Sequence, residues 1–261
     1  MDNPPGLPTP RRIKKFGWIP DLPDKRDLMF SAPLEALGAL PAHVDLTQGC
    51  PPVYDQGELG SCTANAIAAA VEFDRRKEGI QDWVPSRLFI YYNERAIEGT
   101  VNVDSGARIR DGMRSVARQG DCDEKLWPYE LQKFQIKPPP GVYVEAAKHP
   151  VARYERLQQD PLQLKGCLAA GYPFVFGFTV YDSFESPQVA QTGEVPIPGP
   201  AESVLGGHAV MAMGYDDGQQ RFIVRNSWGT GWGKKGYFTM PYAYVTDHSL
   251  ASDFWTVRTV K

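Results

Sequence analysis

The chain has 261 residues, of which 42% are hydrophobic and 23% are charged, and its formal net charge is -3. These values are ordinary for a soluble globular protein, and the length is enough for one large domain or two lobes. The slightly acidic charge does not indicate a nucleic-acid partner, no apolar run approaches the roughly 18 residues of a membrane helix, and the first residues lack the apolar stretch of a secretory signal.

Residues 1–40 differ in composition from the rest of the chain. They contain seven prolines and the basic pairs Arg11-Arg12 and Lys14-Lys15, which favour an extended conformation over a helix. Composition alone is typical of a tail or linker. However, the aromatic stretch from Phe16 to Pro20 indicates a segment that lies on the folded part of the chain. We therefore predict an N-terminal extension over residues 1–40.

The globular part begins at about residue 41 with a turn that leads to Cys62. Helical spacing of Ala64, Ile67 and Val71 predicts a core helix that starts at Cys62. The N-terminus of a helix stabilises a thiolate, so Cys62 is a candidate nucleophile. A small buried cysteine at the start of a core helix explains the same pattern. Gly79 is predicted to end this helix, and further helices are predicted over 85–99 and 108–119.

The second half of the globular part has the pattern of an antiparallel sheet. A short helix from Asp160 to Ala170 and loops over 136–150 and 185–206 are predicted beside it. The predicted strands cover residues 174–181, 208–215, 221–226, 236–240 and 254–260. The domain over 41–261 is thus predicted to be helix-rich over about 41–130 and sheet-rich over about 131–261, which makes the fold class α+β.

Two polar residues of this sheet could complete a site with Cys62. A cysteine nucleophile needs a base, and the base needs a group that fixes its ring. His208 follows two glycines at the start of a strand, and Asn226 lies on the strand that should return beside it after the Asp217-Gly218 turn. Any single histidine is more often structural than catalytic, so His208 by itself does not establish a site.

Three blocks in this order resemble the signature segments of the papain-like cysteine peptidases. They are Gln56-Gly57-x-x-Gly60-Ser61-Cys62, Gly207-His208-Ala209-Val210 and Asn226-Ser227-Trp228-Gly229-Thr230-Gly231-Trp232-Gly233. The chain resembles a bacterial-type member of this family with an atypical N-terminal extension. The resemblance implies a two-lobed fold, with a helical left lobe, an antiparallel β-barrel-like right lobe and the active-site cleft between them.

The resemblance also implies a role for each matching residue. Cys62 would be the nucleophile, His208 the general base and then the general acid, and Asn226 the group that orients His208. Gln56 would donate its side-chain amide to the oxyanion. The substrate-binding residues that it implies are Gly106, Gly207, Trp228 and Ser252, with Trp228 covering the His208–Asn226 bond and with Ala107, Arg108 and Ser252 around the second substrate residue. An arginine at position 108 would favour acidic or polar side chains there, but a solvated arginine at a helix end explains the sequence better.

Two positions depart from the family pattern. Leu59 and Thr63 stand where these enzymes usually have a cysteine and an aromatic residue, so the usual disulfide beside the active site is missing. A bridge between Cys50 and Cys122 is an open alternative, and neither the pairing of Cys167 nor the compartment follows from the sequence.

The function predicted from this resemblance is a cysteine-type endopeptidase that acts through a thioester acyl-enzyme. The alternatives are an acyl transferase or transpeptidase with the same chemistry and a catalytically silent scaffold that binds a peptide or partner. We expect a monomer with a peptide or protein substrate and with no cofactor, metal, nucleic-acid or membrane partner. The extension over 1–40 lacks the long helix of the best-known prosegments, and we predict that it lies on or across the cleft as an intramolecular regulator.

Overall fold

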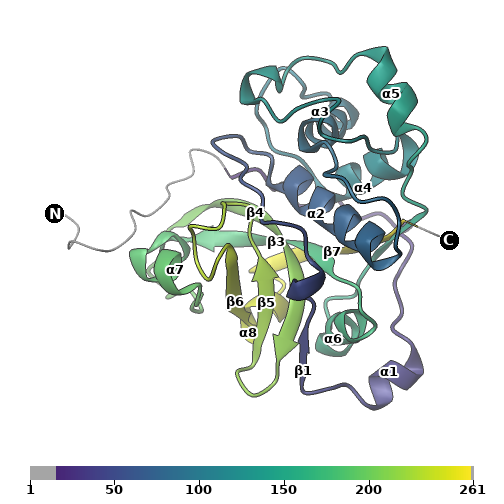
Figure 1. Cartoon of the computed structure of the whole chain (residues 1–261). Coiled ribbons are helices and arrows are strands. Elements are labelled where there is room, and N and C mark those ends of the chain that lie inside the picture. The colour runs from purple at the N-terminus through teal and green to yellow at the C-terminus, as the bar shows by residue number, and fades with distance from the viewer. Residues whose placement is uncertain (1–15, 260–261) are drawn as a thin grey trace.

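A computed structural model describes residues 16–259, so the pairs Arg11-Arg12 and Lys14-Lys15 lie outside the described residues. Helices α2 to α5 gather in one half of the molecule, and an antiparallel sheet forms the other half (Figure 1). The helices are α1 (Leu34–Gly38), α2 (Cys62–Lys77), α3 (Arg87–Glu98), α4 (Ile109–Arg118), α5 (Pro140–Ala146), α6 (Pro161–Ala169), α7 (Pro187–Thr192) and α8 (Tyr242–Thr246), with 3₁₀ turns η1 (Thr47–Gly49), η2 (Leu131–Lys133) and η3 (Asp182–Glu185). The strands are β1 (His43–Asp45), β2 (Arg153–Arg156), β3 (Phe174–Tyr181), β4 (Val204–Asp216), β5 (Arg221–Arg225), β6 (Tyr237–Pro241) and β7 (Ala251–Arg258). Over residues 16–259, no helix is long and apolar enough to cross a membrane.

Helix α2 is the central element between the two halves. Every residue from Cys62 to Arg75 is buried, because α3 and α4 cover one side of the helix and β4 and β7 the other (Figure 1). The small side chains of Ala64 and Ala68 let these neighbours approach closely, and Ile67 fills the space between helices. The predicted start of this helix at Cys62 is confirmed.

Helix α3 shows why its ends could be predicted. The Ser86 hydroxyl accepts the N–H of Phe89 at 3.2 Å, as an N-cap does, and Gly99 ends the helix with a left-handed backbone. Both signals are local in sequence, so they fix the helix without knowledge of its neighbours.

The sheet has the strand order β2-β7-β3-β4-β5-β6, and β1 also pairs with β4. Strands β2 and β6 lie at its two ends and do not pair with each other in the described part of the chain, so the predicted barrel-like half is an open sheet. The α+β class is confirmed, and β3 covers the predicted strand over 174–181.

Two predicted loops contain short helices. The loop over 136–150 contains α5, and the loop over 185–206 contains α7. Each helix has a proline in its first turn, at Pro140 and Pro187, where the missing N–H needs no partner in the helix. These prolines indicate the start of a helix, and the prediction of uninterrupted loops was wrong.

Residues 16–19 pass between the two halves, beside the start of α2. The N–H of Trp18 donates to the carbonyl of Gly207 on β4 at 2.9 Å, and the N–H of Ile19 donates to that of Ala107, just before α4, at 3.0 Å. Ala107 in turn donates its N–H to the carbonyl of Gly17 at 2.8 Å. This stretch is therefore bonded through its main chain to both halves of the molecule.

Candidate active site

Cys62 opens α2 and is fully buried where the two halves meet. The N–H of Ala209 donates to its Sγ at 3.4 Å, which places the preceding residue, His208, beside the thiol. Burial raises the pKa of Cys62 to about 12, although the backbone N–H groups of Ala209, Gly17 and Thr63 act in the opposite direction. With residues 16–19 in place, the thiol is therefore favoured over the thiolate.

His208 and Asn226 come together as the hairpin prediction required. The Nε2 of His208 lies 2.8 Å from the Oδ1 of Asn226, and this oxygen also accepts the N–H of Ser227 at 2.8 Å. Because a carbonyl oxygen only accepts, the Nε2 of His208 carries the hydrogen, and a neutral ring then has its acceptor at Nδ1. Both side chains are almost completely buried.

Aromatic rings enclose this pair. The ring of Trp228 lies 5.0 Å from that of His208 and is tilted by 31°, while Phe178 lies edge-on to the same imidazole at 5.8 Å and Phe184 is tilted to it at 6.3 Å. Phe16 also lies edge-on to the imidazole, with the ring centroids 6.2 Å apart. The His208–Asn226 bond thus lies in a low-dielectric environment, which strengthens it.

Gln56 is held in place by residues of the sheet half. The hydroxyl of Ser227 donates to its Oε1 at 2.6 Å, and its backbone N–H donates to the carbonyl of Ser227 at 2.9 Å. Oε1 is occupied as an acceptor, and the amide nitrogen Nε2 donates to the carbonyl of Leu59, three residues before Cys62, at 2.9 Å. The sequence analysis gave Ser227 no role, although its place next to Asn226 was the available signal.

The predicted substrate-binding residues lie around residues 16–19. The carbonyl of Gly207 accepts the Trp18 N–H, and Gly106 packs so closely that a Cβ there would lie 2.2 Å from the carbonyl oxygen of Gly17. Gly106 contributes this close approach, whereas the main-chain bonds to the segment come from its neighbour Ala107.

The other residues predicted around the second substrate residue have different surroundings. Ser252 is half-buried opposite Gly177 on the neighbouring strand. The Arg108 side chain pairs with Glu98 at 3.7 Å, so its charge is balanced within the helical half. The carboxyl group that contacts the segment is that of Asp253, the residue after Ser252, which the sequence analysis missed.

The two unusual positions beside the nucleophile also have structural consequences. Thr63 donates its hydroxyl to the fully buried carboxyl of Glu94 at 2.6 Å, and Leu59 is buried in the core. Burial raises the pKa of Glu94 well above its usual range. All four cysteines are free, so the Cys50–Cys122 bridge does not form. No cluster of metal-ligating side chains occurs in the described part of the chain.

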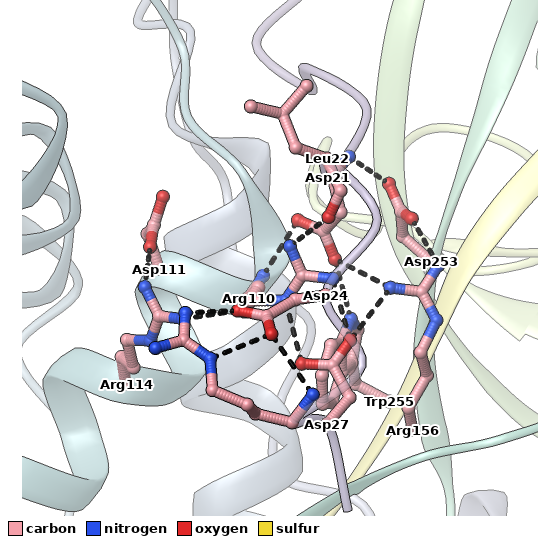
Figure 2. A network of polar contacts seen from close by, with 11 residues as sticks. Asp21, Leu22, Asp24, Asp27, Arg110, Asp111, Arg114, Arg156, Asp253 and Trp255 are labelled. Carbon is pink, nitrogen blue, oxygen red and sulfur yellow. Dashed lines mark hydrogen bonds and ion pairs between the residues drawn. The ribbon is translucent and has the colours of Figure 1, made fainter. Parts of the chain in front are cut away.

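Residues 20–30 are fastened to the body of the molecule by the polar network in Figure 2. Arg110 on α4 binds both carboxyl oxygens of Asp27, at 2.9 and 2.6 Å, and its backbone N–H donates to Asp21 at 3.1 Å. The N–H of Phe30 donates to the carbonyl of Arg156 at 2.8 Å, and the N–H of Arg156 donates to that of Leu28 at 2.8 Å. We call residues 20–30 the strap.

Comparison with known families, sequences and solved structures identifies proteins that are similar to this chain. Residues 40–254 match the family described as "Papain family cysteine protease". The uncharacterized peptidase C1-like protein L477 of Acanthamoeba polyphaga mimivirus is 42% identical over 95% of this chain and 88% of its own length. Xylellain, a cysteine protease from Xylella fastidiosa, is 45% identical, and its crystal structure has a TM-score of 0.89 over 96% of this chain and 99% of the xylellain chain. Digestive procathepsin L 3 of Tenebrio molitor larval midgut, at 20% identity and a TM-score of 0.71 over 89% of this chain and 74% of its own, shares the fold.

Proposed function

The chain belongs to the papain family of cysteine proteases, and from this premise we propose that it is an endopeptidase that uses Cys62, His208, Asn226 and Gln56. As a family member it is a cysteine peptidase, a hydrolase that acts on peptide or protein substrates, with the two-lobed papain-like fold. The observation that supports the proposal is a chain of contacts: the N–H of Ala209, the residue after His208, donates to the Cys62 thiol, His208 is bonded to Asn226, and Gln56 is bonded to the residue after Asn226.

The proposed reaction follows from the hydrogen bonds of the site. Nδ1 of His208 removes the proton from Cys62, and the sulfur attacks the carbonyl carbon of the substrate. The negative charge that develops on the carbonyl oxygen is stabilised by the Cys62 N–H and the Gln56 amide. His208 then gives its proton to the leaving amine, and water, deprotonated by His208, hydrolyses the thioester and restores the thiol. Asn226 holds the ring in the tautomer that these steps need.

Cleavage inside a chain is supported by the path of residues 16–19. Phe16 precedes the residue at the thiol, and fifteen more residues precede Phe16, while the strap continues in the other direction. A peptide segment therefore lies beside Cys62 with chain continuing on both sides, as an endopeptidase requires. The four residues proposed to act in catalysis come from a single chain. We therefore propose that the protein is a monomer, and light scattering over a range of concentrations tests this.

We further propose that residues 16–19 regulate the enzyme by occupying the substrate cleft. The backbone N–H of Gly17 is the group directed at Cys62, and the Gly17 carbonyl is bonded to Ala107 on the other side. The thiol therefore meets a hydrogen-bond donor in place of a carbonyl carbon, so we expect the segment to resist cleavage. The name of procathepsin L 3, which shares the fold, describes a proform, and we take it as a precedent for regulation by an N-terminal segment.

A substitution at Gly17 tests this regulation. A Cβ at residue 17 would lie 1.7 Å from the carbonyl oxygen of Gly60, so Gly17→Ala must displace the segment. We expect faster hydrolysis of a short fluorogenic peptide by this variant than by the unaltered chain. Gly38→Ala is the matched control, because a Cβ there meets nothing within 4 Å. Equal rates for both variants and the unaltered chain would argue against regulation by residues 16–19.

The catalytic assignment is tested by labelling and turnover in the same sample. We expect an active-site-directed epoxide to modify Cys62, and Cys62→Ala to abolish peptide hydrolysis. Hydrolysis that persists in Cys62→Ala would overturn the assignment. Acylation with product release only when an amine is added would identify a transferase, and the absence of acylation in Gly17→Ala would identify a binding scaffold.

A further inference from the structure

The indole of Trp18 fills a side-chain site one residue away from the thiol. Gly17 lies at Cys62, and Trp18 follows it. A Cβ on Gly177 would lie 1.9 Å from Cε2 of the indole, and one on Gly207 would lie 2.7 Å from Cε3. The site, which we call the Trp18 site, can therefore accept a large side chain because glycines form two of its walls.

The end of the Trp18 site is acidic. The indole Nε1 donates to Oδ2 of Asp253 at 3.2 Å, and Asp253 is only 2% exposed. Its backbone has a φ of +59°, and it lies where the pairing of β3 with β7 shifts register between Val175 and Gly177. Bulges of this kind redirect side chains, and a left-handed non-glycine residue persists only where its surroundings hold it. Here the strained backbone directs a carboxylate at the Trp18 site.

The group around Asp253 contains one more carboxyl than guanidinium (Figure 2). Arg156 donates to Oδ1 of Asp253 at 2.8 Å and lies 3.4 Å from Asp21 and 3.5 Å from Asp27. Arg110 pairs with Asp27. Three carboxyls thus face two guanidinium groups, while the outer charges balance one another: Asp24 and Asp111 with Arg26 and Arg114.

The protonation of Asp21 agrees with this surplus. Burial, and then the neighbouring Asp253, raise the pKa of Asp21 to about 7. A carboxyl group that holds its proton near neutral pH for these reasons would ionise more readily if a cation entered beside it.

We propose that the Trp18 site binds the substrate residue next to the one that provides the scissile carbonyl, and that it selects arginine or lysine there through Asp253 and Asp21. This proposal rests on the peptidase function proposed above. A cationic side chain replaces the indole as the donor to Asp253 and balances the surplus carboxyl. An apolar side chain removes one of the two donors to Oδ2 of this buried carboxylate and leaves only the N–H of Asp21, which is unfavourable.

Asp21 belongs to the N-terminal extension, so the extension itself forms part of the specificity site. The strap holds Asp21 independently of Trp18: the indole N–H of Trp255 donates to its Oδ2 at 2.9 Å, and its own N–H donates to Asp253 at 2.7 Å. Displacement of residues 16–19 alone therefore opens the Trp18 site and leaves both carboxyls in place.

The first test uses the full chain with Gly17→Ala and Trp18→Ala together, so that residues 16–19 are displaced from Cys62 and the indole is removed from the Trp18 site. Blocked fluorogenic peptides carry arginine, lysine, leucine or citrulline at the second position, citrulline being a neutral analogue of arginine with the same shape. We expect kcat/KM to be at least about tenfold higher for arginine than for citrulline, since charge-assisted bonds in buried sites differ by this much from neutral ones. Adding Asp253→Asn should reduce this ratio to about one, Asp21→Asn should reduce it partly, and the outer variant Asp24→Asn should leave it unchanged. Equal cleavage of arginine and citrulline peptides, or a ratio that survives Asp253→Asn, would overturn the proposal.

A second test needs no catalysis and separates this proposal from the peptidase function. In the full chain, Trp18→Arg places the proposed cation in the site, and Trp18→Leu places an apolar side chain there. We expect Tm to be higher for Trp18→Arg than for Trp18→Leu by at least about 2–4 °C, and this difference to vanish in the Asp253→Asn background. If no peptide is cleaved but the difference depends on Asp253, the proposed function fails and the cation site stands. A difference that is absent, or that does not depend on Asp253, refutes the cation site.

Discussion

At the scale of single residues, the burial of Cys62 and the hydrogen bonds to its sulfur decide whether its side chain is a thiol or a thiolate. Cys62 is buried under residues 16–19, and its thiol receives N–H groups without gaining access to water. The position of Cys62 at a helix N-terminus led us to expect a stabilised thiolate. In the covered chain, loss of hydration outweighs these influences, because desolvation is the largest cause of the shift in the Cys62 pKa.

This balance predicts a strong pH effect on alkylation. A pKa raised from 9.0 to about 12 lowers the thiolate fraction of Cys62 roughly 10³-fold at any pH below 9. We expect iodoacetamide to label Cys62 of the full chain more slowly than glutathione up to pH 9, and the rate to rise as pH approaches the raised pKa. Labelling is followed by mass spectrometry of the Cys62 peptide, which separates it from the other three thiols.

Gly17→Ala provides the comparison for that measurement. Once the segment is displaced, water and His208 both reach the thiol, and Cys62 should react rapidly already near pH 6. Rapid labelling of the unaltered chain at pH 6 would show that the thiolate exists under the cover and would contradict the role given to desolvation.

At the scale of elements, α3 supplies the carboxyl group of Glu94, which accepts the hydroxyl of Thr63, the residue after Cys62 on α2. Thr63 and Glu94 join the two helices, and a Cβ on Gly112 of α4 would lie 2.6 Å from Oε2 of Glu94, so the carboxyl group of α3 lies against both α2 and α4. Burial raises the pKa of Glu94, and its neutral form is therefore the one that the fold holds.

Glu94→Gln tests this enclosure through the free energy of unfolding. The unfolded chain releases the proton of Glu94 above about pH 4.5, whereas the folded chain keeps it to a higher pH, so the unaltered chain loses stability as pH rises between these values. The variant has no such proton. Its stability relative to the unaltered chain should increase by up to about 1.4 kcal/mol per pH unit above pH 4.5. Urea unfolding at pH 5, 6 and 7 measures the difference, and a difference that is constant over this range would contradict a buried neutral carboxyl.

The elements that the sequence predicted well are those with local signals. The cap at Ser86 and the glycine at Gly99 fixed α3, and Asp160-Pro161 indicated the start of α6. Ser186-Pro187 carries the same kind of signal for α7, but the prolines and glycines that follow it favoured a loop. The residues proposed as catalytic were identified because three ordered blocks carry the resemblance. Asp253 could not, because the register shift that directs it arises only when β3 and β7 pair.

At the scale of the whole molecule, the strap is the part of the N-terminal extension that is bonded to both the helical half and the sheet half. Arg110 comes from α4, Arg156 from β2 and Asp253 from β7, and the carboxyls of Asp21 and Asp27 lie among them (Figure 2). Acidic and basic residues scattered over more than 230 positions of sequence have no pattern that would predict such a cluster. The sequence could therefore indicate that the extension lies on the domain, but not what fastens it.

Arg110→Ala should loosen this fastening. The variant leaves Asp27 buried without the cation that binds both of its carboxyl oxygens, and breaking a buried ion pair from one side typically costs about 3–5 kcal/mol. We expect lower stability in urea and faster hydrogen exchange over residues 18–30. Arg26→Ala is the control, because the Arg26 side chain is 84% exposed and its loss should leave exchange unchanged. Equal exchange in both variants would mean that the strap is held by other contacts.

Pro20 is the single residue between Ile19, which is bonded in the cleft, and Asp21, which is bonded in the strap. So short a connection gives the blocking segment a high effective concentration at the cleft, on the order of millimolar or above, as expected for short tethers. Dilution cannot release it, and a substrate present at micromolar concentration competes poorly with it. We therefore expect residues 16–19 to leave the cleft at a rate that is set within each molecule by its own strap and is the same at every enzyme concentration. If the connection to the strap were removed, residues 16–19 should bind the cleft only weakly.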